Sequence, residues 1–501
     1  MFCSLDSFAV NGIDALRIRV EVDVGNGLPC FDMVGYLASE VREAKERVRV
    51  ALKNSSYPIP AKRITVNLSP ADERKGGTGF DLAIALGILC DLEVIPPELM
   101  EGYGFLGELG LDGSIRSVPG VLPCVYAAKQ AGLRAVLVPS ENAAEGALVE
   151  GVRVYGVRSL TEAAEHFLCE NGGEPAQTPP WEPSHESPDG DFSDIRGQFL
   201  AKRAAEIAVA GMHNLLLCGP PGAGKTMLAK RLPGIMPELT FAESMEITKV
   251  YSVAGLIPPG GGMVQNRPFR APHHTVTVPA LAGGGRFPMP GEVSLASGGV
   301  LFLDELPEFQ RGSIEVLRQP LEDRRIRVAR LNGSAEYPAK FMLVAAMNPC
   351  PCGYYPDRNR CRCTQEQRIR YEAKVSRPIL DRIDLRINVE SLPPGDLIDT
   401  VPAESSEQIR RRVEVARKHQ ELRFEGRPYR YNSEVPGREI DALFRPEPSA
   451  KKEAASYAER SQCSARGYHR LWKVARTIAD LANSDTITKE HVAEAIGYRT
   501  D

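Results

Sequence analysis

The stretch GPPGAGKT, residues 219–226, decides how the middle of the chain folds. It matches the pattern G-x-x-x-x-G-K-[ST], follows the short apolar run NLLLC and opens a helical pattern. Its glycines let successive backbone N–H groups turn toward phosphate oxygens, while Lys225 reaches the β- and γ-phosphates and Thr226 ligates Mg²⁺. The strand-to-helix context favours a phosphate-binding loop over a plain glycine-rich turn. The expected nucleotide-contacting residues are Gly219, Pro220, Pro221, Gly222, Ala223, Gly224, Lys225 and Thr226.

The acidic partner of this loop is expected at the end of a second apolar strand. The run VLFLDE, residues 300–305, places Asp304 where it would hold Mg²⁺ together with Thr226, and Glu305 where it would activate the attacking water. The alternative is a buried strand that ends in a solvated acidic pair. Because two halves of one site occur in the expected order, we predict that the chain binds and hydrolyses ATP with Mg²⁺ as its metal.

A third apolar run and an arginine-containing segment extend the site. FMLVAAMN, residues 341–348, ends at Asn348, whose amide suits a hydrogen bond to the attacking water or the γ-phosphate, or else a plain cap. In SRPILDRID, Arg377 and Arg382 carry guanidinium groups that suit the charge on a transferring phosphoryl group. Surface ion pairs are the alternative for both arginines.

The chain divides into parts around this site, because 501 residues exceed what one core supports. Strand-like and helical runs alternate in residues 1–168, and residues 169–194 are rich in Pro, Gly, Ser and acidic residues, as in a linker. Residues 195–390 hold the parallel core, and residues 391–501 become helical, including the segment ALFRPEPSAKKEAASYAERS. The expected fold class is α/β, a P-loop core with a parallel sheet and a C-terminal helical lid, preceded by a mixed α/β domain.

Composition indicates the cellular compartment of the chain and the kinds of surface it can present. With 43% hydrophobic and 25% charged residues and a net charge of -4, any basic surface must be local. No run approaches the ~18 apolar residues of a membrane span. The first residues lack the order of a signal peptide, and an odd number of cysteines, 11, indicates reduced thiols. We therefore expect a cytoplasmic protein without a membrane partner.

Four of the cysteines form a cluster in NPCPCGYYPDRNRCRC, residues 348–363. Their spacing, C-x-C-x₈-C-x-C, suits tetrahedral Zn²⁺, with free thiols or reversible disulfides as alternatives. The ligands would be Cys350, Cys352, Cys361 and Cys363. Arginines beside Tyr354 and Tyr355 suit phosphate contact and base stacking, or else form a solvated basic loop. These arginines are Arg358, Arg360, Arg362, Arg368 and Arg370.

Several long stretches occur in one order and together indicate a family. They are RGQFLAKRAAEIAVAGMHNLLLCGPPGAGKT, RPFRAPHHT, GEVSLASGGVLFLDELPEF, VAAMNPCPCG and ARGYHRLWKVARTIADL. In them, and over essentially its whole length, the chain resembles the ComM/YifB family of magnesium-chelatase-like AAA+ ATPases. The resemblance assigns sensor 1 to Asn348, a finger offered to a neighbouring subunit's ATP to Arg382, and sensor 2 on the lid to Arg466. A finger acting in trans implies a ring, usually a hexamer.

The resemblance also implies two inserts that would face the pore of such a ring. Residues 269–287 correspond to a helix-2 insert, and the 79 positions from Lys225 to Asp304 leave room for it. Residues 324–341 correspond to a hairpin before sensor 1. Within the first insert, the adjacent His273 and His274 point in different directions on most backbones. We therefore expect them to orient the insert or to touch a subunit interface, and not to share a metal ion.

The N-terminal part resembles a Lon-protease-type domain, with the ribosomal S5 domain 2-like fold, notably in FLGELGLDGSIRSVPGVLPCVYAAKQAGLRAVLVPSENAAE. A Lon protease needs a serine nucleophile paired with a lysine. In KGGTGFDLA the serine position falls on Gly79, and the lysine region VPGVLPCVYAA contains no lysine. Thr78 offers a hydroxyl without a base. We expect a domain that keeps the fold and has lost the chemistry.

Three functions from different classes fit these observations. The family implies an ATP-driven DNA motor, a helicase or translocase that promotes branch migration of recombination intermediates during natural transformation. Its sequence support is the arginine-rich cysteine loop and a basic hairpin with Arg324, Arg325, Arg327 and Arg330. The alternatives are a chelatase-type ATPase that remodels a protein partner, and an ATP-gated scaffold. Stimulation of ATP hydrolysis by single-stranded or branched DNA distinguishes the first from the others.

Overall fold

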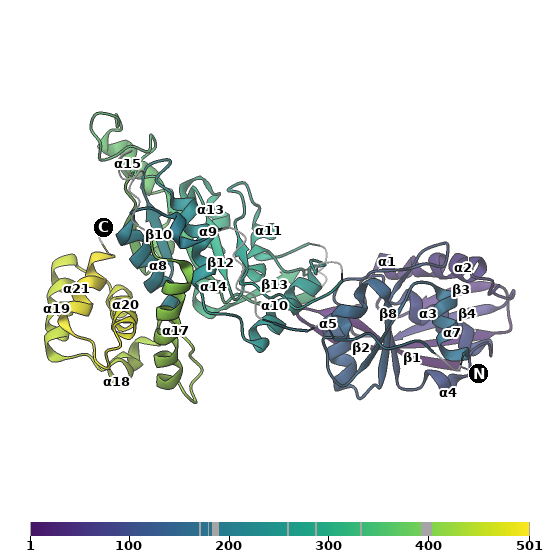
Figure 1. The fold of residues 1–501 in the computed structure, drawn as a ribbon. Helices are drawn as coiled ribbons and strands as arrows, with labels where there is room; N and C mark the ends of the chain where they lie inside the picture. The colour runs from purple at the N-terminus through teal and green to yellow at the C-terminus, as the bar shows by residue number, and fades with distance from the viewer. Residues whose placement is uncertain are drawn as a thin grey trace.

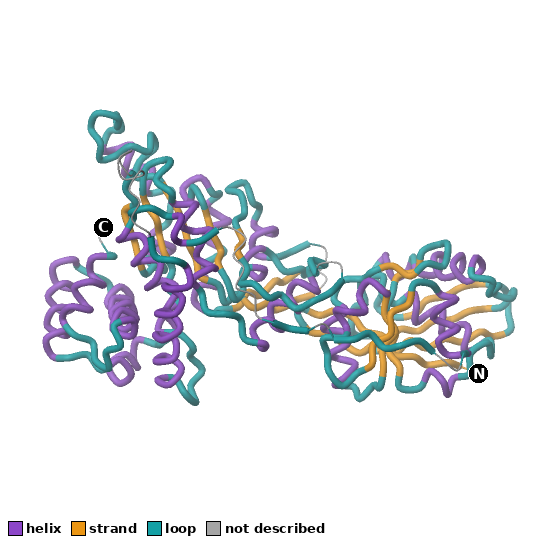
Figure 2. Tube along the Cα trace, in the orientation of Figure 1, coloured by secondary structure: helices purple, strands orange, loops and turns teal. Residues whose placement is uncertain are grey.

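The computed structural model describes residues 2–169, 172–178, 180–182, 190–257, 260–285, 288–330, 333–391 and 403–499. Three units follow one another along an elongated molecule (Figure 1). A sheet-rich N-terminal unit lies at one end, a second α/β unit lies in the middle, and a group of C-terminal helices lies at the other end (Figure 2).

The N-terminal unit is a mixed seven-stranded sheet with helices packed against it. Its strands are β1 (Phe2–Asn11), β2 (Asp14–Gly25), β3 (Cys30–Val34), β4 (Arg63–Ser69), β5 (Tyr103–Phe105), β8 (Ala135–Pro139) and β9 (Arg153–Val157). Its helices are α1 (Ser39–Arg42), α2 (Ala44–Asn54), α3 (Asp81–Asp91), α4 (Pro97–Met100), α5 (Val121–Gln130), α6 (Ala143–Gly146) and α7 (Leu160–Leu168). The short strands β6 (Glu108–Leu109) and β7 (Ile115–Arg116) form a separate ladder.

The order of the main sheet is β3-β4-β2-β1-β5-β8-β9. Alternation in β2 directs Ile18, Val20 and Val22 into the core. Helix α3 packs closely on that strand, because a Cβ at Gly87 would lie 2.7 Å from Val22 Cγ2. Glycine at this position therefore lets the almost fully apolar α3 lie on the sheet.

The middle unit is a five-stranded parallel sheet, as expected from the short apolar runs. Its strands are β11 (Phe269–Arg270), β12 (Val300–Leu303), β15 (Met342–Met347), β10 (Leu215–Cys218) and β16 (Leu385–Asn388), in that spatial order. Its helices are α8 (Phe199–Gly211), α9 (Lys225–Ile235), α10 (Phe241–Val253), α11 (Val278–Ala282), α12 (Glu292–Leu295), α13 (Arg311–Glu315), α14 (Arg318–Asp323), α15 (Gln365–Glu372) and α16 (Arg377–Leu380). A two-stranded hairpin, β13 (Arg325–Arg330) with β14 (Gly333–Pro338), precedes β15.

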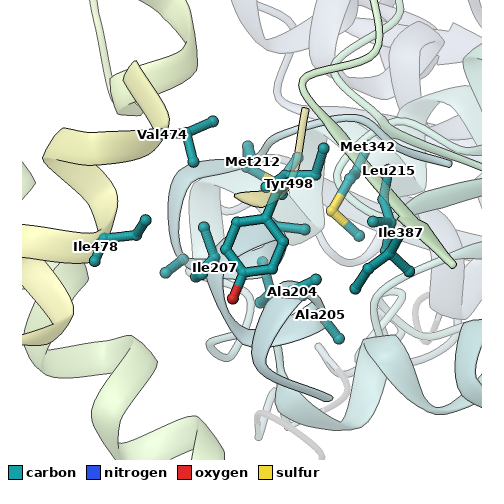
Figure 3. Close-up of a cluster of buried hydrophobic side chains, with 14 of the residues drawn as sticks. Ala204, Ala205, Ile207, Met212, Leu215, Met342, Ile387, Val474, Ile478 and Tyr498 are labelled. Atoms are coloured by element: carbon teal, nitrogen blue, oxygen red, sulfur yellow. The ribbon is translucent and has the colours of Figure 1, made fainter. Parts of the chain in front are cut away.

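The C-terminal unit is helical, and it shares one hydrophobic core with the middle unit. Its helices are α17 (Ser406–Arg423), α18 (Ile440–Phe444), α19 (Pro448–Ser461), α20 (Ala465–Leu481) and α21 (Lys489–Gly497). In Figure 3, Val474 and Ile478 of α20 lie on one side of Ile207 of α8, and Tyr498 and Leu215 of β10 lie on its other side, all in one core. The segment expected to be helical from residue 442 is broken, because Arg445 adopts a left-handed φ of 49° and Pro448 starts a new helix.

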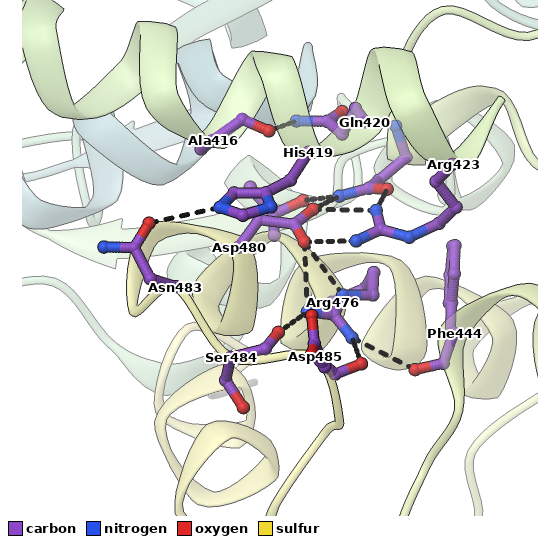
Figure 4. A network of polar contacts seen from close by, with 12 residues as sticks. Ala416, His419, Gln420, Arg423, Phe444, Arg476, Asp480, Asn483, Ser484 and Asp485 are labelled. Atoms are coloured by element: carbon purple, nitrogen blue, oxygen red, sulfur yellow. Dashed lines mark hydrogen bonds and ion pairs between the residues drawn. The ribbon is translucent and has the colours of Figure 1, made fainter. Parts of the chain in front are cut away.

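A buried polar network ties the helices of the lid together (Figure 4). Arg476 is fully buried, pairs with Asp480 at 3.0 Å and donates to the carbonyl oxygens of Phe444 and Asp485. Asp480 also accepts hydrogen bonds from Arg423 of α17 and Asn432. Since a buried charge is stable only when it is paired and hydrogen-bonded, this network fixes α17 and α20 to each other.

Helix α10 joins the N-terminal unit to the middle unit. The Gly120 amide at the start of α5 donates to the Ser252 carbonyl at 2.9 Å, and Lys249 lies over the Tyr126 ring at 4.0 Å. Trp181, in the segment expected to be a linker, donates to Ser244 at 3.2 Å and meets Phe241 edge-on. The described part of that segment is therefore anchored. None of the described helices has the length and apolar content of a membrane span.

Candidate ATP site

The glycine loop lies at the carboxyl end of β10 and leads directly into α9. Gly222 and Gly224 have left-handed φ angles of 77° and 86°, which glycine adopts without strain. A Cβ at Gly219 would lie 2.2 Å from the Val389 carbonyl oxygen, so this position also requires glycine. The loop therefore has the backbone geometry that a phosphate-binding turn needs.

Lys225 is held at the centre of the loop. Its Nζ donates to the carbonyl oxygens of Gly219 and Pro220 at 2.6 and 2.9 Å, and to Asn348 Oδ1 at 3.1 Å. Burial lowers the pKa of the Lys225 ammonium, while the nearby carboxylates of Asp304 and Glu305 oppose that shift. The structure thus brings the predicted lysine and the predicted sensor asparagine into direct contact.

The two acidic residues follow β12 and face the loop. Thr226 Oγ1 donates to Asp304 Oδ2 at 2.7 Å, so the hydroxyl and carboxylate predicted to share Mg²⁺ lie together. Hydroxyl and carboxylate oxygens are suitable ligands for this hard cation. Glu305 has φ 53° and ψ 45°, a left-handed conformation that is uncommon outside glycine. Strained backbone of this kind is concentrated at functional sites, where it aims a side chain.

An open hollow of about 690 Å³ lies beside the acidic strand and the strand that ends at Asn348. Glu305 and Asn348 lie on its wall, together with Cys352 and Cys363 of the cysteine cluster. The Glu305 side chain is 57% exposed, so its carboxylate is accessible to water. The side chains predicted to handle the attacking water therefore share one solvent-filled space.

The arginines predicted to contact the transferring phosphoryl group do not lie at the glycine loop of their own chain. Arg382 donates to Glu322 Oε1 at 2.6 Å, and Arg466 Nη1 lies 3.6 Å from the same oxygen. Both line a hollow of about 710 Å³ that the glycine loop does not border. Arg377 is exposed at the start of α16. The structure thus brings Arg382 and Arg466 together, but it does not bring either one to Lys225 of the same chain.

The four clustered cysteines converge. Their Sγ atoms all lie within 4.8 Å of one another, and Cys350 Sγ lies 3.4 Å from Cys352 Sγ and 3.8 Å from Cys361 Sγ. Zn–S bonds of about 2.3 Å place the sulfurs of a tetrahedral site about 3.8 Å apart, so the cluster suits Zn²⁺. Gly353, between these cysteines, packs on the glycine loop, since a Cβ there would lie 2.7 Å from Pro221 Cδ.

The basic residues of this loop and of the hairpin are partly engaged within the chain. Arg360 lies 4.3 Å from the centre of the Tyr354 ring and Arg368 lies 4.0 Å from that of Tyr355, both cation–π contacts. On the hairpin, Arg325 pairs with Glu336 at 2.8 Å. These two surfaces remain candidates for contact with nucleic acid.

In the N-terminal loop that resembles the Lon active-site region, the polar side chains are hydrogen-bonded to other residues of the same unit. Thr78 Oγ1 donates to the Glu108 carboxylate. Asp81, almost fully buried, pairs with Arg47 through contacts of 2.6 and 3.0 Å and accepts from the Leu109 amide. Burial raises the pKa of Asp81 to about 6, although Arg47 and the Leu109 amide favour the charged form.

Two features of the site were not assigned a catalytic role from the sequence. His274 Nδ1 lies 3.4 Å from Glu305 Oε2, and Gly353 covers Pro221. The adjacency of His273 and His274 was a signal, but only the fold shows that His274 contacts Glu305 and that His273 contacts Thr275. No local pattern predicts the second contact, because it depends on how the cysteine loop folds back.

Comparisons with known proteins identify the family of the chain. Residues 191–397 match the family described as magnesium chelatase, subunit ChlI, residues 20–142 match subunit ChlI of Mg-chelatase, and residues 403–499 match its C-terminal region. The competence protein ComM of Haemophilus influenzae is 43% identical over 513 residues, which cover 98% of this chain and 96% of ComM. YifB of Escherichia coli is 42% identical over 497 residues, again 98% and 96% of the two chains.

A more limited similarity concerns proteases. Lon protease 2 of Bacillus subtilis is 26% identical over 177 residues, which cover 32% of this chain and 31% of the protease. The full-length similarity is decisive, because the identity exceeds 40% along almost all of both chains and the glycine loop, acidic strand and lid are in place. The chain belongs to the ComM/YifB family of magnesium-chelatase-like AAA+ proteins.

Proposed function

We propose that this protein is an ATP-driven DNA motor that works as a ring, usually a hexamer, in the cytoplasm, and promotes branch migration of recombination intermediates. The observation that carries the proposal is the assembled site of Lys225, Thr226, Asp304, Glu305 and Asn348. It occurs in a chain that is 43% identical, over nearly its full length, to the competence protein ComM of Haemophilus influenzae.

In the proposed reaction, the backbone of residues 219–224 and the Lys225 ammonium hold the β- and γ-phosphates of ATP. Thr226 and Asp304 would hold Mg²⁺, which supplies positive charge for the phosphate oxygens. The Glu305 carboxylate takes a proton from water, whose oxygen attacks the γ-phosphorus while the bond to the ADP oxygen breaks. Asn348 orients that water or the γ-phosphate. The phosphate loop, the magnesium ligands and the proton acceptor thus come from one subunit.

The arginines complete the site in a neighbouring subunit. Arg382 and Arg466 share Glu322 in a hollow that the glycine loop does not border, although arginine is the side chain best suited to transition-state charge. In a ring, this face of one subunit would meet the nucleotide of the next. Both the predicted finger and the predicted sensor 2 would then act in trans.

Two local structures support DNA as the substrate. The hairpin β13–β14 carries Arg325, Arg327 and Arg330, and the cysteine loop carries arginines beside tyrosines. A Zn²⁺ ion held by the four cysteines would fix that loop. We infer a structural role for the N-terminal unit without proteolysis, because Thr78 is bonded to Glu108 and the serine position is Gly79.

The test is the ATPase rate with no DNA, with single-stranded DNA and with a branched DNA, each at 50 and 200 mM salt. We expect several-fold stimulation that weakens steeply with salt, because phosphate contacts release counterions. Lys225→Ala is the inactive control. Stimulation should be followed by movement of a labelled branch point. Intact basal hydrolysis without stimulation would instead favour the chelatase-type alternative, in which the motor remodels a protein partner.

A further inference from the structure

The cysteine cluster faces the same solvent-filled space as the catalytic carboxylate. Cys352 and Cys363 line the hollow of about 690 Å³ on whose wall Glu305 also lies. Cys350 is fully buried, whereas the other three cysteines of the cluster are partly exposed. A small solute that enters the hollow therefore reaches Cys352 or Cys363 before it reaches Cys350.

The sulfur atoms of Cys350 and Cys352 are close enough for one to react with the other. Their Sγ atoms lie 3.4 Å apart, and Cys361 Sγ lies 3.8 Å from Cys350 Sγ. An accessible thiolate with a second thiol beside it is the arrangement that peroxides oxidise to a disulfide. Ligation of a metal ion would keep these sulfurs deprotonated and therefore nucleophilic. The cluster thus offers an attacking thiolate, Cys352, and a resolving thiolate, Cys350.

The backbone that follows Cys352 contacts the phosphate loop. Gly353 has a φ of 85°, and its amide donates to the Cys350 carbonyl at 2.9 Å, so a tight turn closes between the two cysteines. A Cβ at Gly353 would lie 2.7 Å from Pro221 Cδ and 3.8 Å from Asn348 Cγ. A change in the turn between Cys350 and Gly353 would therefore shift the part of the chain that packs on Pro221 and Asn348.

We propose that Cys352 is a site of oxidation by hydrogen peroxide, and that the resulting Cys350–Cys352 disulfide weakens nucleotide binding. The inference rests on the proposed function, because it takes residues 219–226 as the nucleotide site and the four cysteines as ligands of Zn²⁺. The disulfide removes two of the four thiolates, so the cluster no longer holds the ion, and it changes the turn that carries Gly353. Peroxide then lowers ATP hydrolysis through the phosphate loop, without a reaction at Lys225 or Glu305.

The oxidation consists of two steps at sulfur. The Cys352 thiolate attacks one oxygen of hydrogen peroxide, so that an S–O bond forms, the O–O bond breaks, and the departing hydroxide takes a proton from solvent. The Cys350 thiolate then attacks the sulfur of the Cys352 sulfenic acid, so that the S–S bond forms, the S–O bond breaks, and a second hydroxide leaves and is protonated. The two thiolates together lose two electrons, and the peroxide is reduced to water.

The experiment compares wild type with Cys352→Ser, Cys363→Ser and Cys30→Ser, before and after treatment with hydrogen peroxide. Released Zn²⁺ is measured with a chromogenic chelator, the disulfide by mass spectrometry of peptides, and nucleotide affinity by titration with a fluorescent ADP. Oxidised wild type should release about one Zn²⁺ per chain, contain the Cys350–Cys352 disulfide and lose at least about threefold in ADP affinity. Dithiothreitol with added Zn²⁺ should restore the affinity.

The two cluster variants separate the disulfide from the loss of a zinc ligand. Each lacks one of the four cysteines, but only Cys352→Ser lacks the attacking thiolate. Cys363→Ser should still form the Cys350–Cys352 disulfide and lose ADP affinity with peroxide, whereas the affinity of Cys352→Ser should not change on oxidation. Cys30→Ser, which removes an exposed thiol of the N-terminal unit, should respond as wild type does.

Oxidised wild type without the Cys350–Cys352 disulfide, or with this disulfide and an unchanged ADP affinity, would overturn the proposal. An equal loss of affinity in peroxide-treated Cys352→Ser would do the same, because the reaction that matters would then lie elsewhere. Should a cluster variant not fold, the peptide map and the ADP affinity of wild type decide the question.

Failure of the proposed function is separable from failure of this inference. The zinc, peptide and ADP measurements contain no DNA, so an ATPase that does not respond to DNA contradicts the motor and leaves these results as they are. Reduced wild type that binds no ADP would contradict the proposed ATP site, and the peptide map alone would then decide whether Cys352 is oxidised.

Discussion

Two glycine-rich loops in this molecule lead directly into helices, but the acidic side chain that faces the second is exposed, whereas the one beyond the first is buried. In the N-terminal unit, KGGTGFDLA leads into α3 with Gly77 at φ 85°, and in the middle unit GPPGAGKT leads into α9 with Gly224 at φ 86°. The difference lies in their polar side chains. Asp81 beyond the first loop is 1% exposed and paired, whereas Glu305 facing the second is 57% exposed.

The lysines of the two loops show the same contrast. Lys75 is fully buried and donates to the Glu73 carbonyl at 2.7 Å, so its charge serves the local fold. Lys225 also donates to carbonyls, but it additionally reaches Asn348 beside the hollow. A loop pattern therefore indicates function only when its polar groups converge on accessible space. Where they satisfy one another, the same pattern is structural.

The largest effect on nucleotide affinity should come from replacing the lysine of the second loop, and the lysine of the first loop is its control. Lys225→Ala should abolish detectable nucleotide binding, because it removes the charge-assisted contacts to the β- and γ-phosphates, at least about 100-fold in affinity. Lys75→Met should leave ADP affinity within twofold of wild type. Fluorescent-nucleotide titration measures both, and circular dichroism confirms folding. Weakened binding in Lys75→Met would show that the N-terminal loop contributes to the site.

Glu305→Gln should separate binding from turnover. The amide cannot accept the proton of the attacking water, so kcat should fall about 10²- to 10⁴-fold while ATP still binds. Glu108→Gln is the matching change in the N-terminal unit, beside Thr78, and should leave kcat unchanged. Normal hydrolysis by Glu305→Gln, measured as phosphate release, would remove Glu305 from its assigned role.

Removing the buried ion pair of Asp81 and Arg47, beside the first loop, should lower stability without changing ATP hydrolysis. Asp81→Ala removes the carboxylate that accepts from the Arg47 guanidinium and the Leu109 amide, and should lower the free energy of unfolding of the N-terminal unit by about 3 kcal/mol. Urea denaturation measures this change. The ATPase rate per folded molecule should be unchanged, and a selective loss of hydrolysis would mean that this unit communicates with the ATP site.

The thiol cluster lies against the second loop, so a Zn²⁺ ion bound there should stabilise the middle unit. Purified protein should contain about one zinc per chain, and Cys350→Ser should lose it and about 2 kcal/mol of stability, a fall in Tm of about 4–8 °C. Cys463→Ser, outside the cluster, is the control. Metal analysis of both variants checks this. A wild-type chain without zinc and with unchanged stability after chelation would favour free thiols.

The sequence predicts the parts of the fold and of the ATP site that depend on residues close together in the chain, and misses those that depend on distant residues. The glycine loop, the acidic strand and the strand ending at Asn348 are local patterns, and the structure brings them together as the parallel arrangement requires. The strand β16 was not foreseen, because four residues, LRIN, carry little periodicity. The break at Arg445 was missed because the helical pattern resumes after two prolines.

Local sequence patterns do not predict contacts between segments that are far apart in the chain. The pairing of Arg382 and Arg466 at Glu322 joins residues from three separate helical regions, and only the packing of α20 against the core produces it. The anchoring of Trp181 on α10 is similar, since a segment rich in Pro and Gly carries no sign of where it docks. In both cases tertiary packing supplies the information.

The smallest effect tests the contact between the cysteine loop and the second glycine loop. Gly353 has φ 85° and a Cβ there would lie 2.7 Å from Pro221, so Gly353→Ala adds a backbone penalty of about 1–2 kcal/mol and pushes on the phosphate loop. ADP affinity should fall about 3- to 10-fold. Gly426→Ala has a similar φ of 71° with nothing within 4 Å of its Cβ, so it should lose similar stability with unchanged affinity. Equal affinities in the two variants would mean that the cysteine loop merely covers the phosphate loop. A selective loss in Gly353→Ala would mean that it shapes the site.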